Sequence, residues 1–150
     1  HILAIPALVR RFPDSDIVIH HLDSGFLGAD ALDRHRSLFS SIGAIPFFEQ
    51  YMEPLPAATI LVNDGDAIAD SAWQVMHTPG HSMGSICLYN KEENILVSGD
   101  TLFNGGFGRT DLSGGNWNDL EESLERLRTL PGETTVLPGH GAQTRIRNEF

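Results

Sequence analysis

The spacing of hydrophobic and polar residues predicts a chain that mixes helices with strands. Ile5, Leu8 and Phe12 follow helical spacing, so residues 2–11 are expected to form a short helix. Residues 17–19 form an apolar run that predicts a short strand. A helix followed by a strand favours a layered architecture built from both element types.

The stretch from residue 22 to residue 58 has the least regular pattern. Residues 29–39 have helical spacing with Asp30 near their start, and three prolines interrupt the pattern between residues 46 and 56. We expect a helical or loop insertion here, of the kind that often covers a substrate pocket.

From residue 59 onwards the pattern is mainly that of β-strands. Five short apolar runs separated by turn residues are expected to be strands: 59–62, 73–77, 85–89, 95–98 and 134–137. The polar segment 90–94, between the third and fourth of these runs, predicts a β-hairpin.

A glycine-rich loop is expected over residues 102–117, followed by a helix that ends near residue 130. Asn118 or Asp119 is the expected N-cap of this helix. Leucines at helical spacing define its apolar face: Leu120, Leu124, Leu127 and Leu130. The order of hairpins, helix and final strand favours an α+β fold, layered as α/β/β/α, over a doubly wound sheet.

Length and composition fit one compact domain over residues 1–150, because 41% of the residues are hydrophobic. The formal net charge of −10 disfavours nucleic-acid binding as the main role, since an acidic chain repels phosphate backbones. No apolar run approaches the roughly 20 residues of a transmembrane helix. We therefore expect no membrane partner and a cytoplasmic location.

Cys87 is the only cysteine, which excludes a disulfide within the chain and a cysteine-rich zinc site. It lies in the apolar run 85–89. We expect a buried small hydrophobic residue here and no catalytic thiol.

Three short segments each place one metal-capable side chain just after an apolar run. These side chains are His81, Asp100 and His140. Gly80 and Gly139 allow the backbone to turn sharply and aim the adjacent histidine. Imidazole nitrogens and carboxylate oxygens bind zinc, and one carboxylate can bridge two ions that hold a hydroxide between them. The pattern predicts a metal site with an open position.

A serine hydrolase is the rival interpretation of the same stretch. Residues 80–84 read G-x-S-x-G, and Ser82, Asp100 and His140 occur in the order nucleophile, acid, base. A nucleophile elbow requires a helix after the serine, whereas a hairpin is expected here, so we favour the metal site. Lone histidines elsewhere are expected to be ordinary surface residues: His20, His21, His35 and His77.

The segments around these side chains resemble those of the metallo-β-lactamase-fold hydrolases. They read T-P-G-H-S at 78–82, S-G-D-T-L-F at 98–103 and L-P-G-H-G at 137–141. The stretch G-F-G-R-T-D-L at 106–112 is similar to the glyoxalase II-like, or hydroxyacylglutathione hydrolase-like, branch. The resemblance covers residues 1–20 and 59–150 and is weak over 22–58.

The resemblance implies a site for two divalent metal ions, with zinc favoured and iron or manganese as alternatives. In that family a T-H-x-H-x-D-H segment opens the site, and His1 looks like its last histidine. By this resemblance His81 binds the first ion and Asp100 bridges both ions and orients the hydroxide. His140 and His1 then bind the second ion.

The resemblance further implies hydrolysis of a thioester or similar ester bond by a metal-bound hydroxide. The substrate is a small molecule, and Phe103 and Arg109 are expected near it. For Arg109 a structural pair with Asp111 is an equal alternative.

The chain starts inside the family's motif, so the resemblance implies an N-terminally truncated member that lacks the first strands. We therefore expect the 150-residue chain alone to bind metal poorly and to be inactive, and its exposed sheet edge to permit self-association. Two alternatives stay open, an iron enzyme similar to the persulfide dioxygenases and a catalytically dead fragment or binding module. The form of residues 138–141 resembles the hydrolases, which favours hydrolysis.

Overall fold

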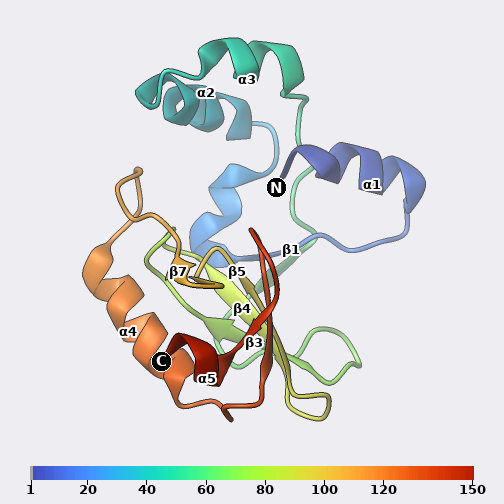
Figure 1. Ribbon diagram of the computed structural model, residues 1–150. Helices are drawn as coiled ribbons and strands as arrows, with labels where there is room; N and C mark the ends of the chain where they lie inside the picture. Colours follow the sequence, from blue (N-terminus) through green and yellow to red (C-terminus); the bar gives the residue numbers. More distant parts are fainter. Residues whose placement is uncertain (1) are drawn as a thin grey trace. The chain divides into compact units, whose positions relative to one another are not determined.

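The computed structural model describes residues 2–150 (Figure 1). Contacts within the chain divide it into two compact units, one ending at Leu61 and one running from Val62 to Phe150. No helix among the described residues is both long and apolar enough to span a lipid bilayer.

The first unit is mainly helical. Its elements are η1 (Ile2–Ala4), α1 (Ile5–Arg11), β1 (Val18–His20), η2 (His21–Phe26), α2 (Ala31–Ser41) and α3 (Ile45–Tyr51). The predicted helix over 2–11 is confirmed, and the predicted strand and second helix are displaced by one or two residues. Strand β1 pairs with β2 (Ile60–Val62), which confirms the strand expected at 59–62.

The expectation that prolines interrupt the helical pattern in this part of the chain is wrong at Pro46, because helix α3 forms there. Pro46 lies in the first turn of α3. A backbone N–H in the first turn has no partner within its helix, so the missing donor of proline is tolerated there.

The expectation of surface histidines is wrong for His20 and His35, which are buried. Nε2 of His35 lies 2.9 Å from the carbonyl oxygen of Phe26, and Nδ1 of His20 accepts the N–H of Leu22. Both rings satisfy local backbone groups of the first unit, which is a structural role. His21 is exposed as expected, and His77 is half-buried.

The second unit is built on a five-stranded mixed sheet in the order β3-β4-β5-β8-β9. Its elements are β3 (Trp73–His77), β4 (Ile86–Asn90), β5 (Ile95–Gly99), β6 (Leu102–Phe103), β7 (Gly106–Phe107), α4 (Trp117–Arg128), β8 (Thr135–Pro138), β9 (Thr144–Arg145) and α5 (Ile146–Glu149). Strands β3, β4 and β5 are antiparallel, and β5 is parallel to β8. The predicted hairpin between β4 and β5 is confirmed.

The segment expected to be a glycine-rich loop contains a small hairpin formed by β6 and β7. The expected N-cap is also wrong, because Asn116 caps α4. Its side chain accepts the backbone N–H groups of Asn118 and Asp119, the two residues proposed as caps. A capping side chain precedes the donors it satisfies, which explains the displacement.

Helices α4 and α5 cover one face of this sheet (Figure 1). Leu127 of α4 and Ile146 of α5 pack in one cluster with Met76, Leu96 and Val136 of the strands. Each fully buried side chain of this size contributes roughly 1.5–3 kcal/mol. The predicted leucine face of α4 is confirmed: Leu120 and Leu127 are buried, and Leu124 and Leu130 pack partly buried on the same side.

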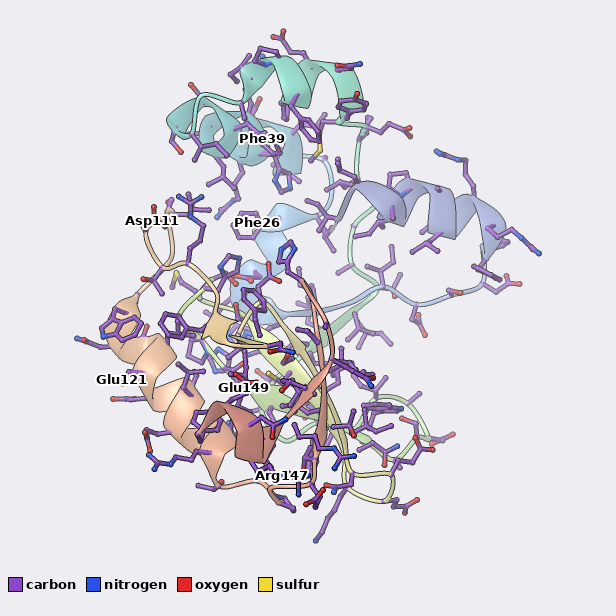
Figure 2. All side chains as sticks on the ribbon, viewed as in Figure 1. Phe26, Phe39, Asp111, Glu121, Arg147 and Glu149 are labelled. Atoms are coloured by element: carbon purple, nitrogen blue, oxygen red, sulfur yellow. The ribbon has the colours of Figure 1, made fainter. Side chains whose placement is uncertain are left out.

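Glu149 on α5 links the end of the chain to the β6–β7 hairpin (Figure 2). One carboxylate oxygen accepts the N–H of Gly105 at 2.7 Å, and the other accepts the hydroxyl of Thr144 at 2.6 Å. The hairpin after Asp100 is therefore fixed from the other end of the unit.

The β3 edge of the sheet is bonded to the segment 65–68. The N–H of Gly65 donates to the Val75 carbonyl, and the N–H of Val75 donates to the Asp66 carbonyl. These bonds occupy backbone groups that a second chain would need for strand pairing.

Candidate metal centre

The sheet topology brings three chain segments to one end of the second unit. Asp100 follows β5 and His140 follows β8, and these strands are parallel neighbours. Strand β3 is antiparallel to β4, which is antiparallel to β5, so β3 runs in the same direction as β5. The loop that carries His81 after β3 therefore leaves the sheet at the same end of the strands as the other two residues.

Two imidazole nitrogens converge on one carboxylate oxygen at this end of the strands. Nε2 of His81 lies 3.6 Å from Oδ2 of Asp100, and Nε2 of His140 lies 3.5 Å from the same oxygen. These separations exceed a normal hydrogen bond. Zinc–ligand bonds of roughly 2.0–2.2 Å in tetrahedral geometry place two ligand atoms about 3.4 Å apart. The observed spacing therefore fits ligands on the surface of a metal ion.

The three side chains differ in exposure: 16% of Asp100, 27% of His81 and 64% of His140 are accessible. The predicted metal residues His81, Asp100 and His140 are thus brought together. Among residues 2–150, however, no group of three or more histidine, cysteine or acidic side chains is arranged so that it could hold a metal ion. The structure shows two contacts, one between His81 and Asp100 and one between His140 and Asp100. The fourth predicted ligand, His1, lies outside the described residues.

The ring of His81 is held by a backbone acceptor. Its Nδ1 lies 2.8 Å from the carbonyl oxygen of Arg109. A carbonyl oxygen can only accept, so Nδ1 carries a proton, and the ring is turned so that Nε2 faces Asp100. Metal-binding histidines are typically oriented in this way, by donating the other ring nitrogen to a carbonyl or carboxylate.

Helix α4 fixes the backbone of the loop that carries His81. The hydroxyl of Ser123 donates to the Pro79 carbonyl at 2.7 Å, and the N–H of Asn116 donates to the Gly80 carbonyl at 2.8 Å. Gly80 has φ +135°, and a Cβ there would lie 2.4 Å from the Cα of Leu120. Only glycine lets the loop approach the helix this closely.

A buried polar cluster beneath the site ties two of the ligand loops together. Oγ1 of Thr78 lies 2.9 Å from Oγ1 of Thr101 and 3.3 Å from Sγ of Cys87. Thr101 follows Asp100 directly, and Thr78 lies three residues before His81. Sequence reasoning missed this cluster, because the two threonines carry no metal-ligand chemistry of their own.

Cys87 is fully buried, as expected. Burial raises the pKa of its thiol to about 11, although hydrogen bonds with Thr78 and Thr101 act in the opposite direction. A neutral thiol of this kind is a poor nucleophile.

The end of strand β3 is clamped to α4 by an ion pair. Arg126 donates to both carboxylate oxygens of Asp64, at 2.7 and 3.1 Å, and also to the carbonyl of His77. Burial alone would raise the pKa of Asp64, but bonds from Arg126 and from the N–H of His77 lower it overall. Asp64 and Arg126 also lacked any sequence signal, because they are 62 positions apart.

Phe103 and Arg109, expected near the substrate, have different surroundings. The ring of Phe103 meets the ring of His140 edge-on, with centroids 5.6 Å apart. The guanidinium of Arg109 forms two hydrogen bonds to Asp111, the alternative considered from the sequence. Figure 2 shows Asp111 on the loop between β7 and α4.

The serine-elbow interpretation lacks its structural context. Ser82 is followed by strand β4 rather than by a helix, and its Oγ lies 2.7 Å from Oγ of Ser85. The nucleophile elbow requires a strand-to-helix turn. The geometry therefore favours the metal site.

Comparison with known proteins gives a match over most of the chain. The family model described as "Metallo-beta-lactamase superfamily" matches residues 1–140. The probable metallo-hydrolase YqgX of Bacillus subtilis is 46% identical over 96 residues, which are 63% of this chain and 46% of YqgX. A hydroxyacylglutathione hydrolase of Yersinia pestis is 32% identical over 141 residues, 93% of this chain and 52% of that enzyme.

Among solved structures, TTHA1623 in a di-iron-bound form is similar, with a TM-score of 0.76 and 32% sequence identity. The similarity covers 99% of this chain and 68% of TTHA1623. The chain spans about half the length of the curated relatives it matches.

Proposed function

The chain belongs to the metallo-beta-lactamase superfamily and has its fold, and from this premise we propose that it is part of a metal-dependent hydrolase. The observation that carries the proposal is the approach of His81 and His140 to one oxygen of Asp100, at 3.6 and 3.5 Å. That spacing, with a donor set of two imidazoles and one carboxylate, fits metal ligation better than hydrogen bonding.

We propose two divalent ions that share Asp100. His81 would hold one ion and His140 the other, which accounts for the pairwise convergence on the carboxylate. By resemblance, His1 would join His140. Imidazole and carboxylate ligands suit zinc, which we favour, and also iron or manganese. The di-iron form of TTHA1623 makes iron the alternative to test.

When bound, the ions would polarise a carbonyl group and lower the pKa of a water molecule. The protein's own residues would orient the reaction. Asp100, mostly buried, would fix the position of both ions relative to the sheet. His81 would present a lone pair whose direction is set by the Arg109 carbonyl. Phe103, packed on His140, would offer an apolar face to the substrate.

A thioester is the proposed substrate class. The similarity to a hydroxyacylglutathione hydrolase supports it, because an acylglutathione is a thioester and the similarity extends over 93% of this chain. The G-R-T-D stretch at 108–111 resembles this branch but also occurs in the persulfide dioxygenases, so it does not by itself select a thioester substrate.

The proposal is tested with protein expressed from its complete gene, supplied with zinc and assayed on S-lactoylglutathione. We expect turnover that a chelator abolishes and added zinc restores. Asp100→Asn is expected to lower kcat/KM by more than about 100-fold, because loss of a ligand costs at least as much as loss of a group that orients one. Asp70→Asn, an exposed position away from the site, is the matched control.

Chelator-resistant turnover, or full activity in Asp100→Asn, would contradict the proposal. Bound iron together with oxygen consumption on glutathione persulfide would assign the dioxygenase alternative instead. Tight metal binding without turnover of any ester would favour a binding module.

A further inference from the structure

The segment 108–111 lies against two of the proposed ligands. A Cβ on Gly108 would be 1.8 Å from the carbonyl oxygen of Asp100 and 3.3 Å from the Cβ of His81. The chain at Gly108 therefore packs against both residues, with room for glycine only. The carbonyl oxygen of the next residue, Arg109, then accepts the Nδ1–H of His81 at 2.8 Å.

We propose that Arg109 is a positioning residue for His81, which acts through its carbonyl oxygen and uses its guanidinium to fix that carbonyl. This inference rests on the proposed function only in treating His81 as a metal ligand. It assigns the arginine of the G-R-T-D stretch a role within the protein, distinct from contact with substrate.

The fixing contact is a forked ion pair across one residue. Nε of Arg109 donates to Oδ1 of Asp111 at 2.7 Å, and a terminal nitrogen donates to Oδ2 at 2.6 Å. Two parallel bonds hold both planar groups in one orientation. Because only Thr110 separates the partners, the pair closes a short ring that restricts the backbone dihedrals on which the direction of the Arg109 carbonyl depends.

The far side of this loop is also packed. A Cβ on Gly115 would be 2.3 Å from the carbonyl oxygen of Thr110, and the N–H of Gly115 donates to the Leu112 carbonyl at 2.8 Å. The loop is therefore restrained both by the ion pair and by the close packing of Gly115 against Thr110.

The ion pair is exposed, with 53% of Arg109 and 67% of Asp111 accessible. Exposed ion pairs contribute little to folding stability. If the pair between Arg109 and Asp111 served only the fold, its removal would change almost nothing that can be measured. The hydrogen bonds from Arg109 hold the pKa of Asp111 at about 2, so the fork persists throughout the neutral range. Its removal should therefore alter the orientation of His81 and leave the fold intact.

The test is the tautomer of His81 in the metal-free protein, measured by long-range ¹⁵N–¹H correlation well above the ordinary histidine pKa of about 6.5. Wild-type protein should carry the proton on Nδ1. In Arg109→Ala the carbonyl is no longer fixed, and Oδ2 of Asp100 is then the nearest acceptor to the ring. A shift toward the Nε2–H tautomer is expected.

Zinc affinity, measured by competition with a chromophoric chelator, should fall about tenfold or more in Arg109→Ala, as is typical when a group that orients a ligand is lost. Arg109→Lys should behave similarly, since an ammonium cannot form the fork. Asp111→Ala, which keeps Arg109, should cause the same tautomer change. Arg128→Ala, which breaks an exposed pair with Glu125, is the matched control and should change neither quantity.

An unchanged tautomer and zinc affinity in Arg109→Ala, with a raised KM that Arg109→Lys rescues, would overturn the proposal and assign Arg109 to substrate. A tautomer change in a protein that hydrolyses no thioester would retain the positioning role and reject the proposed reaction. The two proposals therefore fail separately.

Discussion

At the residue scale, the three proposed ligands that the structure describes are restrained to different degrees. Asp100 is 16% exposed and has Gly108 packed against its carbonyl, and His81 is fixed through Nδ1. His140 is 64% exposed, and its ring contact with Phe103 is an edge-on aromatic pair. Because His140 is the most exposed of the three, we expect its orientation to depend most on bound metal.

The carbonyl oxygen that accepts the hydrogen bond of His81 could not be predicted from the sequence. His81, Asp100 and His140 were predictable, because their side chains carry metal-ligand chemistry next to turn glycines. The Arg109 carbonyl was not, since every residue except the chain end has a similar backbone oxygen. Its direction depends on the fold of the loop and on Asp111.

Cys87 gives a prediction about the buried cluster beneath the site. Its thiol should react only very slowly with Ellman's reagent at about pH 8, because burial raises its pKa to about 11 and denies access. In urea the thiol should react at the rate of an ordinary cysteine. Fast labelling of the folded protein would contradict its burial.

The same raised pKa has a consequence for stability. Above the ordinary value of 9.0 the unfolded thiol ionises while the folded thiol stays neutral. The contribution of Cys87 is therefore fully present below pH 9 and is lost as the pH rises from about 9 toward 11. Urea titrations across this range measure the loss.

At the element scale, helix α4 positions the site. It packs on the β-sheet through Leu127 and bonds to the loop before His81 through Asn116 and Ser123. The apolar pattern predicted this helix and its leucine face. It did not predict β9 or α5, because elements of two and four residues are too short for a periodic pattern and depend on contacts such as those of Glu149.

Gly80→Ala tests this packing. A Cβ at Gly80 would overlap the backbone of α4 at Leu120, so we expect a loss of at least about 2 kcal/mol in the free energy of unfolding. The measurement is urea denaturation followed by circular dichroism.

Gly65→Ala is the control, because Gly65 also has a positive φ, of +84°, but nothing lies within 4 Å of its added Cβ. It should show only the backbone cost, about 1 kcal/mol. Equal losses in the two variants would mean that the approach of the loop to α4 does not matter for stability.

At the scale of the whole molecule, His81, Asp100 and His140 all belong to the unit that runs from Val62 to Phe150. The superfamily match extends over residues 1–140 and so includes both units. Self-association through a sheet edge stays a prediction. The two edge strands of this sheet are β3 and β9. Because β3 is bonded to residues 65–68, the two-residue strand β9 is the edge at which a second chain would pair.

The fold class was predictable from the order of patterns, because hairpins, helix and final strand each have local signals. The convergence of the three segments was predictable only from their joint pattern and from the resemblance. The division into two units was not predictable from the sequence. It depends on which residues contact one another in the folded chain, and no local pattern encodes that.

The most direct test is a crystal structure of the protein expressed from its complete gene and soaked with zinc, with anomalous scattering measured at the zinc edge. We predict anomalous peaks at bonding distance, roughly 2.0–2.2 Å, from the carboxylate of Asp100 and from Nε2 of His81 or His140. Nδ1 of His81 should remain bonded to the Arg109 carbonyl. Zinc bound elsewhere, with Asp100 and both histidines uncoordinated, would contradict the central claim.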